Sequence, residues 1–384
     1  MKILIAVTHL LGTGHLRRAI NLSQAFVAAG HRVTLVSGGL PVPAFDTSGI
    51  SLAQLPALHS DGTNFTRLLA EDGTVASTGY LESRCRVLKE IVEANKPSVV
   101  ITELFPFGRR VLSEEFLVLL EAAHSLARKP VILASVRDIL ATPSSAEKAL
   151  KTEVLIERYY DAVVVHSIRD STPLNASWPV STGLEKKLFY SGYVAQHTEN
   201  PNPGLSVTAG DIIVSAGGGS VGRQVYETAI GASRLSSQLS TGCRWHILVG
   251  GSDAESEVVR LKNLASGTPT IIEPNRPDFR QLLQQARCSV SMCGYNTAVD
   301  LLLTGTPGVL IPFDADGETE QTIRARSLAR QPYFSLLSGK DLSARNLYDA
   351  VVPLASAGRF KIDLNQFNGA VETVGFATKL AQCT

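Results

Sequence analysis

Hydrophobic positions along the chain alternate between short continuous runs and longer amphipathic stretches. In the first half, five short runs rich in β-branched residues predict strands, over residues 3–8, 32–37, 98–102, 131–136 and 162–166. Between the first two runs, apolar residues recur at helical spacing over 16–29, and Gly30 follows as a stop signal. Strands that are apolar at nearly every position and separated by helices predict a parallel sheet covered on both faces.

The same rhythm restarts after a polar, proline-rich stretch at residues 197–209, which we interpret as an interdomain linker. The second half predicts strands over 211–215, 245–249, 270–272 and 289–292, with helices from about 221 and over 255–264 and 279–286. The expected fold class is therefore α/β, with two Rossmann-like domains, 1–196 and 210–364, that face each other across a cleft. Residues 365–384 are expected to form a C-terminal helix.

Composition narrows the class of protein. The 384 residues are 44% hydrophobic and 18% charged, enough apolar material for two cores, and the net charge of +1 predicts no strong, sequence-independent attraction to nucleic acid. The five cysteines are scattered without zinc spacing, which favours a reducing compartment. No apolar run reaches the ~18 residues of a spanning helix, and the apolar N-terminus is expected to be a strand and not a signal peptide.

The expected location is the cytoplasm, and peripheral contact with the inner face of the membrane is left open. Local patches could meet an anionic membrane although the net charge is near zero. Apolar segments such as 104–107 and 116–120 could touch lipid, but such segments are more often core. The sequence does not specify an oligomeric state.

The most informative segment is 292–300, in which an apolar strand leads through a glycine turn into a helix that carries an acid. The amides around Gly294, Asn296 and Thr297 would lie at a helix N-terminus, which suits an anion. Asp300 would then accept hydrogen bonds from ribose hydroxyls, or would only complement the helix dipole. Together these features predict a site for a nucleotide diphosphate.

A second glycine loop, at residues 215–223, follows a predicted strand and precedes a helix. Consecutive amides at Gly218 and Gly219, with the hydroxyl of Ser220, can bind a diphosphate, and Arg223 can neutralise it. The structural alternative is a tight strand–helix turn, which would not need three adjacent glycines.

Three further residues of the second half are candidate donor contacts. Arg276 follows a predicted strand and is either a phosphate ligand or a solvated loop residue. Glu320 and Gln321 follow an acidic loop and can hydrogen-bond sugar hydroxyls. The loop carboxylates Asp314 and Asp316 lack the arrangement of a metal site, so no metal and no cofactor is predicted.

The first domain offers a candidate base. Gly12, Thr13 and Gly14 lead from the first strand into a helix, and His15 lies at the carboxyl edge of the sheet, where a neutral imidazole can take a proton from a hydroxyl. The alternative is a histidine that merely packs against the helix start. Arg17 is either an acceptor-phosphate ligand or a solvated residue. The loop completes neither a P-loop nor a GxGxxG pattern.

Two later strands of this domain are each followed by charged residues. Glu103 and Arg109 follow one strand, and Arg137 and Asp138 follow another. All four are candidate acceptor contacts because loops after parallel strands gather at one edge of the sheet. Structural arginine–carboxylate pairs are the alternative.

These motifs resemble those of the GT-B glycosyltransferases, most closely glycosyltransferase family 28. Residues 13–15 resemble the family's Thr-Gly-Gly-His loop, one glycine shorter, and 218–222 match its Gly-Gly-Ser-x-Gly turn. Asp300 stands where the family has a ribose-binding Glu. Glu320 and Gln321 stand where it has a Gln-Gln pair that contacts the sugar, so the donor sugar is not carried over.

The resemblance implies a bacterial hexosyltransferase of GT-B fold that performs inverting, metal-independent transfer. The first domain would bind an acceptor, which is a glycan, a lipid-linked molecule or a small molecule, and His15 would be the base. The second domain would bind the nucleotide-sugar, with UDP-sugars favoured. Residues 365–384 would pack back on the first domain.

Two other functions fit the same fold. One is a nucleotide-sugar hydrolase or 2-epimerase. An epimerase would need more acids and bases around the sugar, which the stretch 314–320 can supply, whereas a hydrolase would act without an acceptor. A nucleotide-sugar-binding protein without catalysis would keep the donor site alone. A dinucleotide oxidoreductase is disfavoured because neither glycine loop completes GxGxxG followed by an acid.

Overall fold

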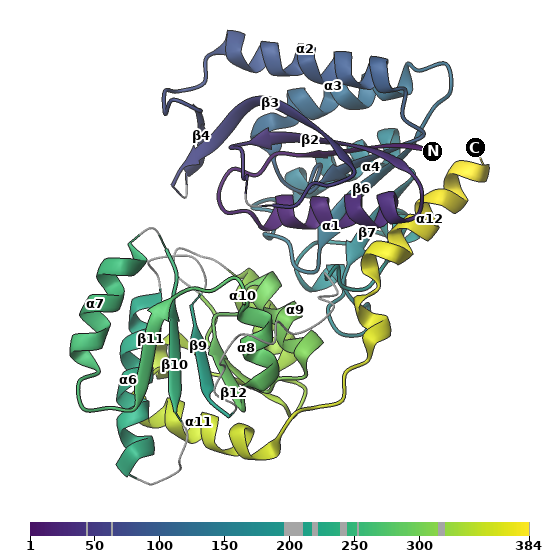
Figure 1. The fold of residues 1–384 in the computed structure, drawn as a ribbon. Coiled ribbons are helices and arrows are strands. Elements are labelled where there is room, and N and C mark those ends of the chain that lie inside the picture. The colour runs from purple at the N-terminus through teal and green to yellow at the C-terminus, as the bar shows by residue number, and fades with distance from the viewer. Residues whose placement is uncertain are drawn as a thin grey trace. The chain divides into compact units, whose positions relative to one another are not determined.

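The computed structural model describes residues 1–43, 45–62, 64–195, 210–216, 222–238, 244–251, 253–313 and 319–383. The chain forms two compact units, Met1–Gln196 together with Asn365–Thr384, and His197–Leu364 (Figure 1). Each unit is an α/β structure built around its own sheet. The predicted linker, 197–209, lies outside the described residues.

The sheet of the first unit has the strand order β4-β3-β2-β1-β5-β6-β7-β8 in the part of the chain that the structure describes. All neighbouring strands are parallel except β3 and β4, which form an antiparallel edge pair. The strands are β1 (Lys2–Val7), β2 (Arg32–Gly39), β3 (Ile50–Asp61), β4 (Asn64–Ala70), β5 (Val99–Glu103), β6 (Val131–Arg137), β7 (Ala162–His166) and β8 (Leu188–Tyr190).

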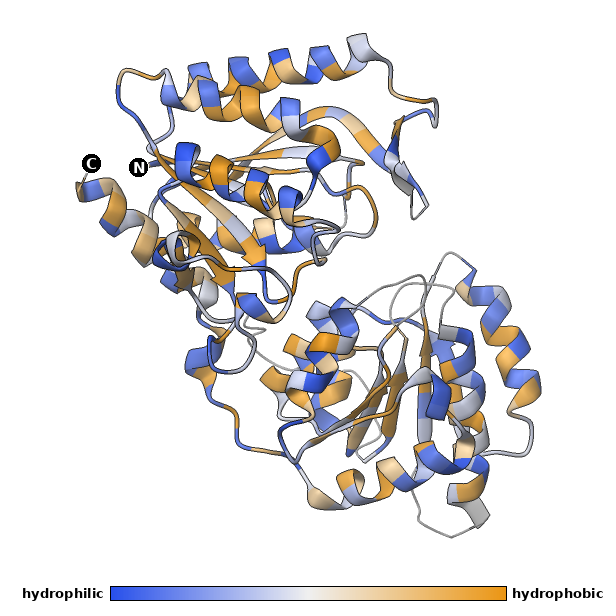
Figure 2. Ribbon diagram, turned by 180° about the vertical axis from the view of Figure 1, so that it is seen from behind, coloured by the Kyte–Doolittle hydropathy of each residue, from blue (hydrophilic) through white to orange (hydrophobic). Residues whose placement is uncertain are grey.

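Helices cover both faces of this sheet, as its nearly continuous apolar strands require. Along β1, Leu4 and Ala6 belong to one core, and Ile3, Ile5 and Val7 to the other. The first core is covered by α2 (Thr78–Asn95), α3 (Ser113–His124), α4 (Ala146–Tyr159) and α5 (Thr182–Lys187), and the second by α1 (Gly14–Ala28) and α12 (Gly369–Cys383). In Figure 2 the strands are coloured mainly as hydrophobic, whereas the helices alternate between hydrophobic and hydrophilic residues.

The C-terminal helix α12 belongs to the first unit, where it lies beside α1 (Figure 1). The rings of Phe189 and Phe376 stack with centroids 4.0 Å apart. Backbone hydrogen bonds also connect the segment after β8 to the segment that leads into α12. Tyr193 N–H donates to Gln366 O at 2.7 Å, and Gly369 N–H donates to Tyr193 O at 3.1 Å. Residues from the two ends of the chain therefore share one core.

The second unit has a parallel sheet with the order β11-β10-β9-β12-β13-β14 among the described residues. Its strands are β9 (Ile212–Ser215), β10 (Trp245–Val249), β11 (Thr270–Pro274), β12 (Cys288–Ser291), β13 (Gly308–Leu310) and β14 (Phe334–Leu336). Its helices are α6 (Arg223–Gln238), α7 (Ala254–Leu264), α8 (Phe279–Gln285), α9 (Tyr295–Thr304), α10 (Glu320–Leu328) and α11 (Ala344–Ala357). The predicted α/β class with two Rossmann-like domains is confirmed.

Each sheet reverses its strand order at one point, between β1 and β5 in the first unit and between β9 and β12 in the second. In open parallel sheets, ligands bind outside the carboxyl ends of the strands at such a switch point. The candidate base follows β1, and the segment 292–300 follows β12. The fold therefore places both sets of predicted residues where sheets of this kind bind ligands.

The apolar segments 104–107 and 116–120 contribute to the core. Of the two interpretations, lipid contact and core packing, the second is therefore the one observed. Phe105, Phe107 and Phe116 are at most 3% exposed and belong to the core under α2 and α3. Among the described residues, no helix is both long enough and apolar enough to cross a bilayer.

Candidate active site

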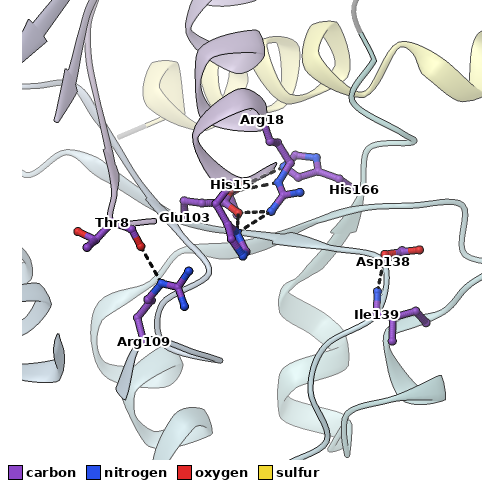
Figure 3. Close-up of polar contacts among 9 residues, drawn as sticks. Thr8, His15, Arg18, Glu103, Arg109, Asp138, Ile139 and His166 are labelled. Carbon is purple, nitrogen blue, oxygen red and sulfur yellow. Dashed lines mark hydrogen bonds and ion pairs between the residues drawn. The ribbon is translucent and has the colours of Figure 1, made fainter. Parts of the chain in front are cut away.

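The candidate base lies at the start of α1, directly after the turn that follows β1. Gly12 has φ +65°, a left-handed conformation that favours glycine, and Thr13 and Gly14 lead into the helix. His15 Nδ1 is 2.8 Å from Oε1 of Glu103, the last residue of β5 (Figure 3). An ionised carboxylate only accepts hydrogen bonds, so Nδ1 carries the proton and Nε2 keeps its lone pair.

Arg18, one turn further along α1, completes this cluster. Its Nε donates to Glu103 Oε2 at 3.3 Å and its Nη2 pairs with Oε1. The same Nη2 is 3.1 Å from His15 Nδ1, a contact without a hydrogen bond because both nitrogens are donors. Burial alone would raise the pKa of Glu103, but the Arg18 charge and the bond from His15 outweigh it and lower this pKa. Burial lowers the pKa of His15 to about 3 although Glu103 acts in the opposite direction. At neutral pH the pair is therefore a carboxylate and a neutral imidazole.

Further polar side chains continue from Glu103 along the carboxyl ends of the neighbouring strands. Ser135 Oγ donates to Glu103 Oε2 at 2.7 Å and is 2.9 Å from His166 Nε2. His166 Nδ1 is 2.8 Å from Ser191 Oγ. His166 is fully buried, and burial lowers its pKa to about 3.

The predicted acceptor contacts are only partly brought together. Arg109, whose φ is +58°, donates from Nε to the Thr8 carbonyl at 2.7 Å (Figure 3), and burial with the nearby Arg137 lowers its pKa to about 10 despite Glu103. Arg137 also acts electrostatically on His15. Asp138 is 1% exposed, and its Oδ1 accepts the N–H of Ile139.

Arg17 lies apart from this cluster. It is exposed, and its guanidinium lies over the ring of Phe45, 5.2 Å from the centroid. This contact with an aromatic face is a sufficient structural role for the side chain.

In the second unit, α9 begins at the switch point. Gly294 is its N-cap residue and has no side chain to occupy the first amides, while Asn296 is exposed and Thr297 half-buried. This leaves a helix N-terminus of the kind that binds anions. Asp300 lies in the second turn, where Arg280 of α8 contacts its Oδ1 through Nε at 2.7 Å and through Nη2 at 2.6 Å.

Gln321 connects the loops that follow two neighbouring strands. Its Oε1 accepts from Cys293 N–H at 3.1 Å, after β12, and from Phe313 N–H at 3.2 Å, after β13. Arg324, one turn later on α10, donates to the Cys293 carbonyl at 2.8 Å. Glu320 begins α10 and is 9% exposed.

The two predicted arginine ligands of the donor are held by acids. Arg276 contacts Asp278 at 2.7 Å and Glu273 at 3.1 Å. Arg223 is 3.5 Å from Glu257, and its side chain is 60% exposed. The exposed Arg223 side chain is the less constrained of the two.

Gly218, Gly219 and Ser220 lie outside the described residues, as do Asp314 and Asp316. Within the described ranges, no group of three or more His, Cys, Asp or Glu could hold a metal ion.

Sequence reasoning did not single out His166, Arg280 or Arg324 as candidate site residues. His166 ends a predicted strand, so its place at the sheet edge could be inferred from the sequence. Its hydrogen-bond partners, Ser135 on β6 and Ser191 after β8, could not be inferred. Arg280 and Arg324 lie on helices and depend on how those helices pack, which the periodic pattern does not specify.

The whole chain has the fold of GT-B glycosyltransferases. It aligns with Acinetobacter baumannii MurG over 99% of this chain and 100% of that one, with a TM-score of 0.64 and 14% identity. It aligns with the glycosyltransferase VinC, solved in complex with dTDP, over the full length of both chains, with a TM-score of 0.62 and 13% identity.

The family signal is concentrated in the second unit. Residues 213–368 match the model of the glycosyltransferase family 28 C-terminal domain. The chain thus has the GT-B fold, and residues 213–368 resemble the C-terminal domain of family 28.

Curated relatives are named UDP-N-acetylglucosamine–N-acetylmuramyl-(pentapeptide) pyrophosphoryl-undecaprenol N-acetylglucosamine transferase. One from Synechococcus sp. strain JA-2-3B'a(2-13) is 31% identical over 126 residues, 33% of each chain. The one from Caldanaerobacter subterraneus is 24% identical over 237 residues, 59% of this chain and 62% of that one. The chain spans about a third to three fifths of the length of these two relatives.

Proposed function

We propose that this protein is a glycosyltransferase that moves a sugar from a nucleotide-diphosphate donor to an acceptor hydroxyl, with UDP-sugars as the favoured donors. The observation that carries the proposal is the His15–Glu103 pair, in which the carboxylate fixes the Nδ1–H tautomer and leaves Nε2 as an acceptor. The UDP preference is supported by the names of the curated relatives, which describe UDP-N-acetylglucosamine transferases.

In the proposed reaction, His15 Nε2 takes the proton of the acceptor hydroxyl while the oxygen attacks the anomeric carbon. The bond from that carbon to the diphosphate oxygen breaks, and the electron pair leaves with the diphosphate. Attack opposite the leaving group inverts the anomeric centre. Glu103, buried and ionised, stabilises the imidazolium that forms, as the carboxylate of a catalytic triad does.

On the donor side, we propose that the diphosphate binds at the N-terminus of α9 around Gly294 and to Gly218, Gly219 and Ser220. Asp300, oriented by Arg280, would accept the ribose hydroxyls. Fixed amide dipoles can stabilise a leaving diphosphate. On this basis, and on the family resemblance, we propose that transfer is metal-independent.

On the acceptor side, positive charge predominates. Arg18, Arg109 and Arg137 lie within electrostatic reach of Glu103 or of one another. Several guanidinium groups around one carboxylate suit an acceptor that brings hydroxyl or anionic groups. Arg109 and Arg137 are therefore the favoured acceptor contacts, and Asp138 is less favoured because its Oδ1 is used by the backbone.

The first test is the thermal shift of the purified protein with UDP, GDP, ADP and dTDP, each with and without EDTA. We expect one nucleotide series to raise the melting temperature equally in both conditions. Stabilisation that EDTA abolishes would overturn metal independence, and no stabilisation by any nucleotide would overturn the donor site.

The second test measures release of the nucleotide diphosphate from its sugars in the presence of a panel of lipid-diphosphate-linked sugars, glycans and small alcohols. His15→Ala should lower turnover by about 10²–10⁴-fold and leave nucleotide binding unchanged, because general base catalysis contributes about that much. His31→Ala, beyond the opposite end of α1, is the matched control and should retain turnover. Acceptor-independent release would favour a hydrolase, and NMR of the product tests inversion.

A further inference from the structure

Four neighbouring strands of the first unit each lead to one buried polar side chain at the same edge of the sheet. Glu103 ends β5, Ser135 lies near the end of β6, His166 ends β7, and Ser191 follows β8. Their exposed fractions are 2%, 1%, 0% and 4%. We call these four residues the polar ladder. Of the four, only Glu103, which is hydrogen-bonded to His15, has a role in the reaction proposed above.

Each proton in the polar ladder can be placed, because Glu103 is ionised and can only accept. The Ser135 hydroxyl donates to Glu103 Oε2 at 2.7 Å, so its oxygen accepts from His166 Nε2–H at 2.9 Å. His166 Nδ1 is then the bare nitrogen, and it accepts the Ser191 hydroxyl at 2.8 Å. This hydroxyl has one hydrogen, so the 3.0 Å approach of Ser191 Oγ to the Gly192 carbonyl is a contact without a second bond.

The chain of hydrogen bonds ends at one carboxylate, that of Glu103, which accepts from Ser135, His15 and Arg18. Glu103 Oε2 receives Ser135 and Arg18 Nε, and Oε1 receives His15 Nδ1–H and Arg18 Nη2. Oε1 faces His15 while Ser135, opposite Glu103 on β6, holds Oε2. Without this bond the carboxylate can turn away from Nδ1, which then has no acceptor that fixes its proton. Arg18 contacts both oxygens and so does not distinguish them, whereas Ser135 contacts Oε2 alone.

We propose that Ser135 and His166 are positioning residues for the base: His166 orients the Ser135 hydroxyl, which holds the Glu103 carboxylate so that it fixes the Nδ1–H tautomer of His15. This inference rests on the proposed role of His15. It also accounts for a fully buried imidazole, since a polar group in a core must be satisfied by partners and His166 is bonded at both nitrogens.

The direct test is nitrogen NMR of histidine-labelled protein near pH 7.5, with His15 assigned by His15→Gln. In the unaltered protein we expect His15 to be protonated at Nδ1. Ser135→Ala and His166→Leu should each produce a substantial population protonated at Nε2. His166→Gln should restore the original tautomer, because its amide N–H can occupy the place of Nε2–H.

The turnover number should decrease as the fraction of His15 protonated at Nδ1 decreases. We expect kcat to fall about 10- to 150-fold in Ser135→Ala and His166→Leu, the size of one hydrogen bond to a charged group, with an unchanged donor KM and near-complete recovery in His166→Gln. Tyr160→Phe is the matched control. It removes a buried hydroxyl bonded to Thr102 Oγ1 at 2.9 Å, next to Glu103 on β5, without touching the polar ladder. It should affect stability and leave both the tautomer and kcat unchanged.

The two proposals fail in different ways. Full turnover in His15→Ala would overturn the role of His15 as the base. If His15→Ala is inactive but Ser135→Ala and His166→Leu keep the Nδ1–H tautomer and full kcat, only the polar ladder inference is overturned. If His166→Leu does not fold, Ser135→Ala and the His166→Gln comparison still decide the question by the same NMR measurement.

Discussion

One hydrogen bond, from His15 to Glu103, determines what His15 can do. Were the proton on Nε2, the same side chain in the same place could not accept a proton from a hydroxyl. A carboxylate partner, unlike an amide, cannot donate, so it admits only one tautomer. The proposed role of His15 as a base therefore depends on Glu103, the residue at the end of the neighbouring strand.

Replacing Glu103 with Gln should test this dependence. The amide nitrogen of Gln can donate to Nδ1, which would move the proton to Nε2 and remove the base. We expect kcat to fall by about two to four orders of magnitude, as when a triad carboxylate is replaced by its amide. Nucleotide binding, measured by calorimetry, should be unchanged, and a small effect on kcat would contradict the assigned role.

The buried histidines also predict a dependence of stability on pH. The pKa values of His15 and His166 are about 3 when folded, against an ordinary value of 6.5. Above pH 7 both histidines are neutral in the folded and in the unfolded protein. Between pH 6.5 and 3, protons bind to these histidines only in the unfolded chain. Stability of the first unit should therefore fall as pH drops below 6.5, by on the order of 1 kcal/mol per pH unit for each histidine.

Urea unfolding at pH 7.5 and 5.0 measures this effect, with Trp178 fluorescence as the reporter in a Trp245→Phe background. His166→Gln does not titrate in this range and should reduce the loss of stability at pH 5.0. An equal loss with and without His166 would show that its imidazole is not kept neutral by the fold.

At the scale of single residues, the sequence predicted side chains of the candidate site but not which of them contact one another. His15 and Glu103 were both candidates, yet they are 88 positions apart and meet because β1 and β5 are neighbours. Arg276, by contrast, has partners that are close to it in the sequence. Its place after β11 suggested either a phosphate ligand or a solvated loop residue, and Asp278 and Glu273, both within three positions, contact its guanidinium.

At the scale of elements, α10 joins the ends of two strands to each other. Gln321 Oε1 accepts an amide from each of the two loops, and Arg324 holds the carbonyl of one of them. The predicted sugar contact therefore also has a structural role. Its Oε1 is occupied by the backbone, so a bond to the donor sugar would use the amide nitrogen as donor.

Two substitutions of Gln321 separate these roles. Gln321→Glu retains an oxygen for the two amides but loses the N–H donor, so it should raise the donor KM with little change in melting temperature. Gln321→Leu leaves the amides of Cys293 and Phe313 without this acceptor, which should cost about 1–3 kcal/mol for each buried amide. Equal melting temperatures for the two variants would contradict the structural role.

At the scale of the whole molecule, the two units can be followed separately, because the chain has two tryptophans and each is buried in the core of a different unit. Trp178 belongs to the first and Trp245 to the second. If the second unit holds the nucleotide, a ligand at about 100 times its Kd should stabilise that unit by about 2.7 kcal/mol.

The measurement is urea unfolding of Trp178→Phe and Trp245→Phe, each with a single reporter, with and without the nucleotide selected by thermal shift. We expect the Trp245 transition to move to higher urea and the Trp178 transition to stay in place. A shift seen only through Trp178 would place the nucleotide on the first unit and contradict the proposed donor site.

Much of the architecture could be predicted because buried parallel strands are apolar at nearly every position. β1, β5, β7 and β10 were placed to within a residue on this basis. β3 and β4 were not predicted, because this edge pair is more exposed and its residues do not form a continuous apolar run. The order of the strands could not be predicted either, since the hydrophobic pattern gives the faces of a strand and not its neighbours.

The membership of α12 in the first unit has a consequence for synthesis. After residue 196, a ribosome must add 168 residues (197–364) before the segment that completes the first core, which takes about 10–30 s at about 5–20 residues per second. During that time the apolar surface that Val374, Ala377 and Ala381 later cover is open. A chain that ends before Val374 leaves this surface exposed for good, which makes such a fragment a substrate for the chaperones and proteases that bind exposed apolar surface.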